Sequence, residues 1–220
     1  VQTHGDQLTD IAFAADQLRA QDVEHAVLLP EHCPATSGNV RTDTVLELAR
    51  QSNGFFIPFA SVDPVSDDEP AALLERYIAA GARGLKLYPS YQFYYPNESR
   101  VYPLYEVCAA HGIPVLLHIG SSVIPGTRLK YCDPIHLDDV AVDFPTLSIV
   151  MAHGGRGWWY DAAAFLALSH PTVWIELSGL PPKRLPTYYA RHDLGRLARR
   201  WIFATDWPGV PGTAANARAV

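Results

Sequence analysis

Three short apolar runs of this sequence each lead into a polar side chain that can bind a metal or carry a proton. These residues are His118, His153 and Asp206. Two imidazoles and one carboxylate suit a borderline cation such as Zn²⁺, which takes N and O ligands and keeps a position open for water or substrate. A single histidine at such a place is often only a hydrogen-bonded structural residue. Three such residues at the ends of three runs favour a metal site.

The apolar runs have the length and composition of buried strands, and helix-like stretches separate them. The seven expected strands are 25–30, 55–62, 84–88, 114–120, 147–152, 173–177 and 201–205. The expected helices are 10–22, 41–51, one that begins at 67–70, 102–111, 136–143, 162–169 and 193–200. We expect Asp161 to cap the helix 162–169, and the segments 31–39 and 89–102 to be loops. Strict alternation without hairpins predicts parallel strands, in a doubly wound sheet or a barrel.

The turn after the first expected strand separates these two folds. A nucleotide-binding doubly wound sheet needs a glycine-rich turn there, whereas Pro30 is followed by Glu31-His32-Cys33. We therefore predict an α/β fold, a (β/α)8 TIM barrel, as a single domain over residues 1–220. Such barrels have eight strands and about 250 residues. We expect the first strand and the last helix to lie outside this sequence, so that the domain is incomplete at both ends.

Composition narrows the class of protein and its partners. The chain has 220 residues, of which 48% are apolar, and a formal net charge of −6. This acidic balance argues against nucleic acid or an anionic membrane surface as the main partner, and every apolar run is too short to span a bilayer. The three cysteines are widely spaced and odd in number, which favours a reduced, cytoplasmic protein. We expect a small-molecule substrate, with a homo-oligomer as an open possibility.

Three further side chains are candidates for binding a substrate. Arg156 follows His153 by three residues, and its planar guanidinium matches a carboxylate through two hydrogen bonds. Lys86 is a charged residue in the middle of an apolar strand, where it can hold a carboxylate or extend its amine to the barrel mouth. Trp158 can wall an apolar or ring-shaped pocket, together with the tyrosines of the loop 89–102, or these aromatic residues can form a subunit interface.

Five motifs, in their order and spacing, resemble one known family. They are Gly84-Leu85-Lys86-Leu87-Tyr88-Pro89, Pro114 to His118, His153-Gly154-Gly155 with Trp159-Tyr160, Glu176-Leu177-Ser178-Gly179 and Thr205-Asp206-Trp207-Pro208. The family is the amidohydrolase superfamily, more closely the branch of metal-dependent hydrolases and decarboxylases that includes aminocarboxymuconate semialdehyde decarboxylase (amidohydrolase-related family 2). The resemblance covers nearly the whole chain from the first helix onward.

The resemblance implies roles for the strand-end residues. By it, His118 is a metal ligand, His153 is a catalytic histidine that faces the substrate, and Asp206 is a metal ligand that also moves protons. It further implies a His-x-His pair on the first strand, which this sequence does not show, because Gln2 stands two residues before His4. Either that strand precedes Val1 or the metal site is lost. Lys86 is not a bridging metal ligand in the branch that this chain resembles.

We therefore expect a divalent-metal enzyme, with zinc as the expected metal, that hydrolyses a small carboxylate-bearing or cyclic substrate through an activated water. In this reaction Asp206 takes the proton of the water and His153 stabilises the developing oxyanion. Two alternatives stay open. The first is a nonoxidative decarboxylase of an aromatic or unsaturated carboxylic acid, in which an arginine holds the carboxylate. The second is a non-catalytic barrel, if the His-x-His pair is truly absent.

Overall fold

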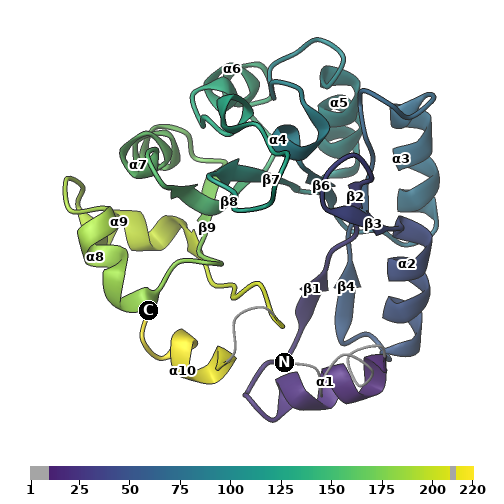
Figure 1. Ribbon diagram of the computed structural model, residues 1–220, viewed down its shortest axis with the longest axis horizontal. Coiled ribbons are helices and arrows are strands. Elements are labelled where there is room, and N and C mark those ends of the chain that lie inside the picture. The colour runs from purple at the N-terminus through teal and green to yellow at the C-terminus, as the bar shows by residue number, and fades with distance from the viewer. Residues whose placement is uncertain (1–9, 209–211) are drawn as a thin grey trace.

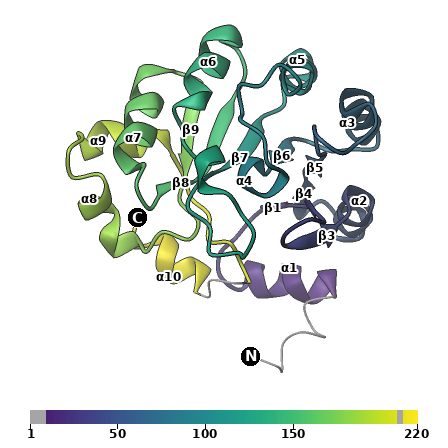
Figure 2. The same cartoon turned by 45° about the horizontal axis from the view of Figure 1, so that its top comes forward.

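Parallel strands follow one another around a common axis, and helices cover their outer side (Figures 1 and 2). The computed structural model describes residues 10–208 and 212–220. The barrel strands are β1 (Ala26–Leu28), β4 (Phe56–Pro58), β5 (Ala60–Ser61), β6 (Leu85–Leu87), β7 (Val115–Gly120), β8 (Ile149–Arg156), β9 (Val173–Glu176) and β10 (Trp201–Ile202). Neighbours in the order β10-β9-β8-β7-β6-β5 pair in parallel, and β1 pairs in parallel with β4.

The strands β4 and β5 form one continuous connection between β1 and β6. The N–H of Phe59 donates to the carbonyl of Leu28 at 3.0 Å, and the next N–H, that of Ala60, donates to the carbonyl of Gly84 at 2.8 Å. The chain thus changes partner within two residues while it keeps its direction. Counted in this way, the described residues contain the seven parallel strands that the sequence predicts.

Alternation along each strand separates the helix-facing core from the barrel interior. On β7, Val115, Leu117 and Ile119 are fully buried in the main core, which includes side chains of the surrounding helices. Leu116 belongs instead to a second cluster in which β4, β7, β8 and β9 meet. Because side chains two residues apart share a face, His118 points to the same interior side as Leu116. The same reasoning places Lys86 of β6 and Glu176 of β9 inside the barrel.

Each of the seven predicted helices is present, and the described residues add three more. The helices are α1 (Ile11–Arg19), α2 (Thr42–Gln51), α3 (Pro70–Ala79), α4 (Pro89–Gln92), α5 (Tyr102–His111), α6 (His136–Asp143), α7 (Tyr160–Ser169), α8 (Leu185–Tyr188), α9 (Leu194–Leu197) and α10 (Thr213–Ala217). The predicted helix 193–200 is present as α9 and a following 3-10 turn, whereas α4, α8 and α10 were not predicted. The carboxylate of Asp10 caps α1 by accepting from the N–H groups of Ala12 and Phe13. No helix in the described residues is long and apolar enough to cross a membrane.

Three local predictions are wrong. One is the loop 89–102, which begins with the short helix α4. Asp161 does not cap α7, because that helix begins at Tyr160; its carboxylate binds the side chains of Arg191 and His192 instead. The predicted loop 31–39 contains an antiparallel hairpin, β2 (Glu31–Cys33) and β3 (Gly38–Val40). Tertiary contacts hold this hairpin, since the ring of His32 binds Asp67 at 3.0 Å.

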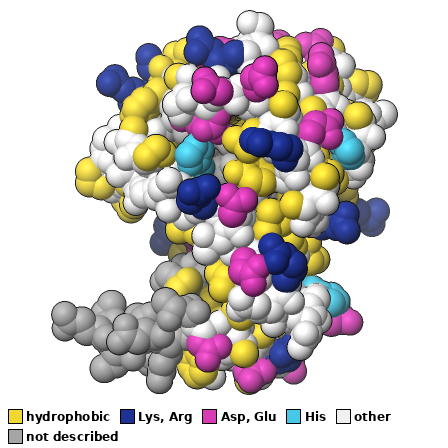
Figure 3. Space-filling view, turned by 90° about the vertical axis from the view of Figure 1, so that its right-hand side faces the viewer, with side chains coloured by type: hydrophobic (Ala, Val, Ile, Leu, Met, Phe, Trp, Pro, Cys, Tyr) yellow, Lys and Arg dark blue, Asp and Glu magenta, His cyan; other side chains and the backbone are white. Residues whose placement is uncertain are grey.

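The outer surface carries both signs of charge. On the side that includes α2 and α3, acidic and basic side chains are interspersed (Figure 3). Arg41 with Asp43 and Arg50 with Glu47 form ion pairs on α2 and at its start. This face therefore shows no extensive patch of one sign.

Candidate active site

His118 lies at the centre of the predicted site, inside the barrel. Its side chain is 3% exposed, and its Nε2 atom is buried without a hydrogen-bond partner in the described part of the chain. Burial, reinforced by the charges of nearby groups, lowers the pKa of this imidazole well below its usual value. The ring is therefore neutral, which is the form that binds a metal. Other buried side-chain atoms of the described chain also have no partner, such as the hydroxyl of Ser61; at His118 the free atom is a lone-pair nitrogen beside a second histidine, and that combination makes it a candidate ligand.

The two predicted histidines lie together. The ring centroids of His118 and His153 are 4.7 Å apart, and Tyr91 packs edge-on against His118 from another side, at 4.9 Å. His118 pairs in register with Ala152 of β8, so His153 follows directly from that level of the barrel. A left-handed backbone at His153, with φ of 67°, accompanies this placement. The sequence prediction that these two strand ends meet agrees with the geometry.

The ring of His153 is oriented by Ser178. Its Nδ1 lies 3.0 Å from the carbonyl oxygen of Ser178 and 2.8 Å from the hydroxyl oxygen of the same residue. A carbonyl can only accept, so Nδ1 carries the hydrogen and Nε2 keeps its lone pair. Burial, together with the positive charges of Lys86 and Arg156, lowers the pKa of His153 to about 4. At neutral pH this imidazole is a proton acceptor.

Glu176 is a site residue that sequence reasoning did not assign. Its carboxylate is buried and accepts from the backbone N–H groups of His153 at 3.1 Å and Ser178 at 3.0 Å. Burial raises its pKa, and these hydrogen bonds and the charge of Lys86 act in the opposite direction. The available signal was a glutamate and a serine at the end of the apolar run 173–177. That signal matched the known family pattern, but a role for either residue requires the geometry.

Arg156, at the end of β8, is held in place by the neighbouring strand. Its Nε and Nη2 donate to the carbonyl of Ser121 at 3.0 and 2.8 Å, and Ser121 N–H donates to the carbonyl of Arg156 at 2.7 Å. This approach requires Gly120, where φ is 114° and a Cβ would lie 2.5 Å from the backbone nitrogen of Arg156. Within the described chain, Nη1 of Arg156 has no hydrogen-bond partner. It is the part of the guanidinium that is left for a ligand.

Lys86 is a buried cation inside the barrel. Its side chain is 3% exposed, and its Nζ lies 4.7 Å from the ring centroid of Tyr88. Burial lowers its pKa to about 8, and the carboxylates of Glu176 and Asp206 limit that effect. Near neutral pH the amine is therefore largely charged.

Asp206 and Trp158 occupy more open positions. Asp206 is exposed, has a left-handed backbone with φ of 65°, and acts through its charge on Lys86 and His153. Trp158 is 73% exposed, and its recorded ring contact is with Trp159. The structure thus gathers His118, His153, Arg156 and Lys86, with Asp206 near them, and leaves Trp158 at the surface. The assignment of Trp158 to substrate binding stays a prediction.

The residues present fit a divalent metal in part. The free, neutral Nε2 of His118 is suited to a metal, and Asp206 offers an acidic oxygen ligand. In residues 10–208 and 212–220, however, no cluster of three or more His, Cys, Asp or Glu side chains could hold a metal ion. The described chain supplies two of the expected ligands rather than a full set. His4 lies outside the described residues, so its exclusion as a ligand is not tested.

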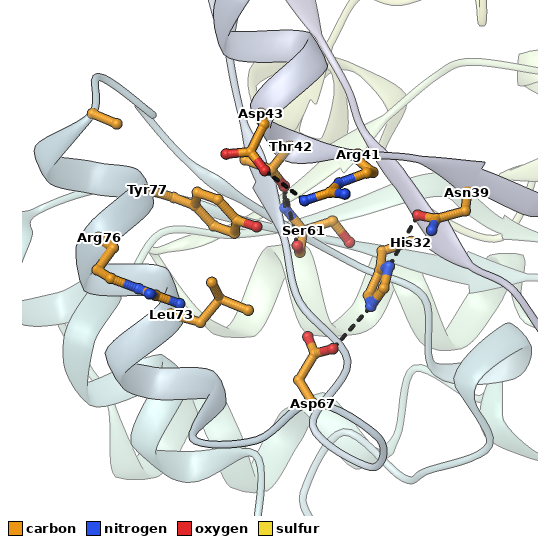
Figure 4. A pocket seen from close by; sticks show the side chains of 11 residues that line it. His32, Asn39, Arg41, Thr42, Asp43, Ser61, Asp67, Leu73, Arg76 and Tyr77 are labelled. Carbon is orange, nitrogen blue, oxygen red and sulfur yellow. Dashed lines mark hydrogen bonds and ion pairs between the residues drawn. The ribbon is translucent and has the colours of Figure 1, made fainter.

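The described residues line two cavities, one away from the predicted site and one beside it. A cavity of about 580 Å³ lies between α2, α3 and the hairpin, where Arg41, His32, Asp67 and Tyr77 are among its lining residues (Figure 4). None of the predicted site residues lines it, and its acidic and basic groups largely offset one another. A second cavity, of about 470 Å³, reaches the ends of β9 and β10, with Gly179 among its lining residues. Gly179 directly follows Ser178, so this second cavity adjoins the site. The larger of the two cavities lies away from the predicted residues, so the buried polar groups locate the site and the cavity volume does not.

Comparison with solved structures shows the fold. An uncharacterised TIM-barrel protein from Bordetella bronchiseptica is 24% identical, with a TM-score of 0.79 over 96% of this chain and 75% of that one. A probable 2-pyrone-4,6-dicarboxylic acid hydrolase from Acinetobacter baumannii is 17% identical, with a TM-score of 0.68 over 95% and 79%. A 5-carboxyvanillate decarboxylase from Novosphingobium aromaticivorans, solved with bound manganese, is 14% identical, with a TM-score of 0.68 over 96% and 74%. The predicted TIM-barrel fold is confirmed.

Comparison with sequences places the chain in a family. A search of curated proteins gives no match. The family model described as amidohydrolase matches residues 4–220, nearly the full length of the sequence. The predicted resemblance is therefore confirmed, and this chain belongs to the amidohydrolase family.

Proposed function

We propose that this protein is a metal-dependent hydrolase that acts on a small, carboxylate-bearing or cyclic substrate. The observation that carries the proposal is the buried, neutral and unpartnered Nε2 of His118, beside a His153 whose ring is oriented as a proton acceptor. Membership of the amidohydrolase family supports it.

His118 and Asp206 are the described residues that would hold the metal. When bound, a divalent cation supplies Lewis acidity, which polarises a carbonyl and lowers the pKa of water. We propose Zn²⁺, because imidazole and carboxylate are both ligands that it takes. Manganese is bound in the similar decarboxylase structure, so it is the second cation to test.

The sequence prediction gives the proton of the water to Asp206. We instead propose that His153 performs the proton transfers, because its Nδ1 is held as a donor and its Nε2 keeps the lone pair. Its Nε2 accepts a proton from the attacking water while the water oxygen forms a bond to the substrate carbonyl carbon. The imidazolium so formed donates a hydrogen bond to the developing negative charge, and it gives its proton to the leaving oxygen when the C–O bond breaks. The carboxylate of Asp206 is a second acceptor for a proton. Protons and charges balance over the cycle, because one water is added across the bond that breaks.

Two fixed cations support a substrate that carries a carboxylate. Arg156 presents Nη1 while its Nε and Nη2 are anchored to Ser121, so binding a carboxylate there orders few additional groups. Lys86 places a second positive charge in the buried interior. By their names, the similar hydrolase and decarboxylase structures act on carboxylic acids.

A decarboxylase is the second candidate function. The observation that favours it is the edge-on packing of Tyr91 against His118, which provides an aromatic wall beside the site. In this reaction the arginine holds the carboxylate, the C–C bond to CO₂ breaks, and Asp206 delivers a proton to carbon. The same cations hold the carboxylate until the bond breaks, CO₂ leaves as a neutral molecule, and the proton that goes to carbon is replaced from solvent.

The function is tested with the purified protein, supplied with Zn²⁺ or Mn²⁺ and assayed on two substrate panels. One panel contains esters and lactones with a carboxylate, and the other contains hydroxybenzoate-like acids monitored for CO₂ release. We expect hydrolysis that a chelator removes and added metal restores, and we expect His118→Asn to lose both bound metal and activity. Undiminished hydrolysis by metal-free protein would contradict metal dependence. CO₂ release without ester or lactone cleavage would favour the second candidate.

Lys86 gives a pH-dependent prediction. Because its pKa is lowered to about 8, the amine is charged below that pH and loses its charge as the pH rises through it. The KM for a carboxylate substrate should therefore rise above pH 8, approaching tenfold per pH unit, while Lys86→Met should have a raised, pH-independent KM. A substrate analogue whose carboxylate is replaced by an amide is the control, and its KM should change little. Equal pH profiles for the two substrates would rule out the contact.

A further inference from the structure

The geometry points to Ser178, fixed by Glu176, as a positioning residue that holds the imidazole of His153 in one tautomer and one orientation. This inference rests on the proposed function, in which His153 accepts a proton. In that proposal neither Ser178 nor Glu176 contacts the substrate, and the inference gives both a role. Ser178 lies two residues after the end of β9, whereas His153 lies within β8, so the contact joins two neighbouring strands.

The first step of the argument concerns the hydroxyl hydrogen of Ser178. Oγ lies 2.8 Å from Oε2 of Glu176 and 2.8 Å from Nδ1 of His153. A carboxylate only accepts, so the single hydroxyl hydrogen goes to Glu176. Oγ must then accept from Nδ1 of His153. The backbone carbonyl of Ser178, 3.0 Å from the same nitrogen, makes the same demand.

The second step concerns the other ring nitrogen. Two acceptors on one residue both require a hydrogen on Nδ1, so a neutral His153 has its lone pair on Nε2. That nitrogen is the one left for chemistry. If the ring changed tautomer, Nδ1 would present a lone pair to two oxygen lone pairs, and if the ring flipped, Cδ2 would take the place of Nδ1 and both hydrogen bonds would be lost. Ser178 therefore excludes the form in which His153 could not take a proton at Nε2.

The third step concerns what fixes Ser178 itself. Glu176 accepts from the backbone N–H of Ser178 with Oε1, at 3.0 Å, and from the backbone N–H of His153 with Oε2, at 3.1 Å. One buried carboxylate thus ties together the backbone at both residues and the serine hydroxyl. The next residue is Gly179, where an added Cβ would lie 2.4 Å from Nη1 of Arg156. The turn therefore packs closely against the guanidinium of Arg156 as well as against His153, whose Nδ1 would lie 3.6 Å from the same Cβ.

A purely structural link between β8 and β9 is the competing explanation, and it makes a different prediction. A structural link would affect folding stability without selecting a tautomer. A positioning residue would affect kcat, and it would change which ring nitrogen carries the hydrogen. Loss of the partner that orients a metal-bound histidine costs about 10–100-fold in metal affinity or activity, and we expect an effect of similar size for this catalytic histidine.

The test uses Ser178→Ala and Ser178→Thr in the full chain. Ser178→Ala removes the hydroxyl acceptor, and we expect kcat to fall about 10–100-fold with little change in KM, while Ser178→Thr, which keeps a hydroxyl, restores most of it. Nitrogen-15 NMR of the imidazole, assigned with His153→Asn, should show the Nδ1–H tautomer in the wild type. In Ser178→Ala only the backbone carbonyl still accepts from Nδ1, so the share of this tautomer should fall. Ser61→Ala is the matched control, since Ser61 is also buried on a barrel strand but its hydroxyl has no hydrogen-bond partner in the described chain. It should leave the His153 spectrum unchanged.

The NMR measurement separates failure of this inference from failure of the proposed function. It needs no substrate, so an Nδ1–H tautomer that Ser178→Ala disturbs supports the inference even if no hydrolysis is found. An Nε2–H tautomer in the wild type overturns it. So does a folded Ser178→Ala with wild-type kcat or an unchanged tautomer. If Ser178→Ala does not fold, the wild-type and Ser178→Thr spectra still decide between the two tautomers.

Discussion

Replacement of His153 by Asn should lower kcat by about 10²–10⁴-fold, the usual contribution of a positioned general base, while the protein stays folded. Asparagine is close in size, and it tolerates the left-handed backbone at this position, where φ is 67°. It has no group that accepts and returns a proton near neutral pH. Steady-state kinetics on the best hydrolysed substrate, with a thermal melt of the same sample, measures both expectations.

The pH profile adds an independent readout on the same residue. The pKa of His153 is lowered to about 4, and a base works only when unprotonated. The acid limb of kcat/KM should therefore lie well below the ordinary histidine value of 6.5 and should disappear in His153→Asn. His111→Asn is the control, because His111 is a histidine paired with Glu75 on the outer surface, and it should behave as the wild type. A His153→Asn variant that keeps half of its activity would exclude His153 as the base.

Replacement of Arg156 by Met should raise the KM for a carboxylate substrate strongly. Truncating one partner of a buried, hydrogen-bonded charge pair costs about 2–5 kcal/mol, which corresponds to roughly 30- to 5,000-fold in affinity. Arg156→Lys should recover only part of the loss, since an ammonium cannot reproduce a planar guanidinium that is anchored to Ser121 through two nitrogens. Binding and kinetic measurements on the three proteins test this order.

Two controls make the Arg156 result specific. Arg128→Met removes an exposed guanidinium that lies over the ring of Phe93, and it should change KM little. A neutral substrate analogue without the carboxylate should bind the wild type and Arg156→Met with similar affinity. If Arg156→Met and Arg156→Lys lose affinity for the neutral and the charged substrate equally, Arg156 supports the structure of the barrel mouth and does not bind the substrate carboxylate.

The elements that local physics dictates could be predicted from the sequence. The helices α5 and α6 have the boundaries 102–111 and 136–143 in both the prediction and the structure, because the apolar spacing and their flanking turns agree. The hairpin β2–β3 could not be predicted in this way. Its strands have three residues each, and contacts far along the chain stabilise it, such as the hydrogen bond from Tyr88 to the carbonyl of Pro30.

The sequence predicted which histidines lie in the site, but it did not predict the hydrogen bonds that orient them. Polar residues at the ends of parallel strands meet at one end of a barrel, so the proximity of His118 and His153 followed from the strand assignment alone. The roles of Glu176 and Ser178 did not, because they depend on how the turn after β9 directs backbone N–H groups. The error at Asp161 has a similar origin. The glycine-rich segment before α7 lets that helix start at Tyr160, two residues earlier than a capping role for Asp161 would require.

The left-handed backbone at His153 and at Asp206 limits how this barrel can evolve. Such a conformation costs about 1–2 kcal/mol for an ordinary residue, so most side chains that drift could place at either position would add strain as well as remove function. Asparagine, aspartate and glycine are the replacements that carry the smallest backbone penalty. A descendant that has lost activity is therefore expected to carry one of these three residues at position 153. The left-handed backbone at this position would then remain in a protein that no longer catalyses the reaction.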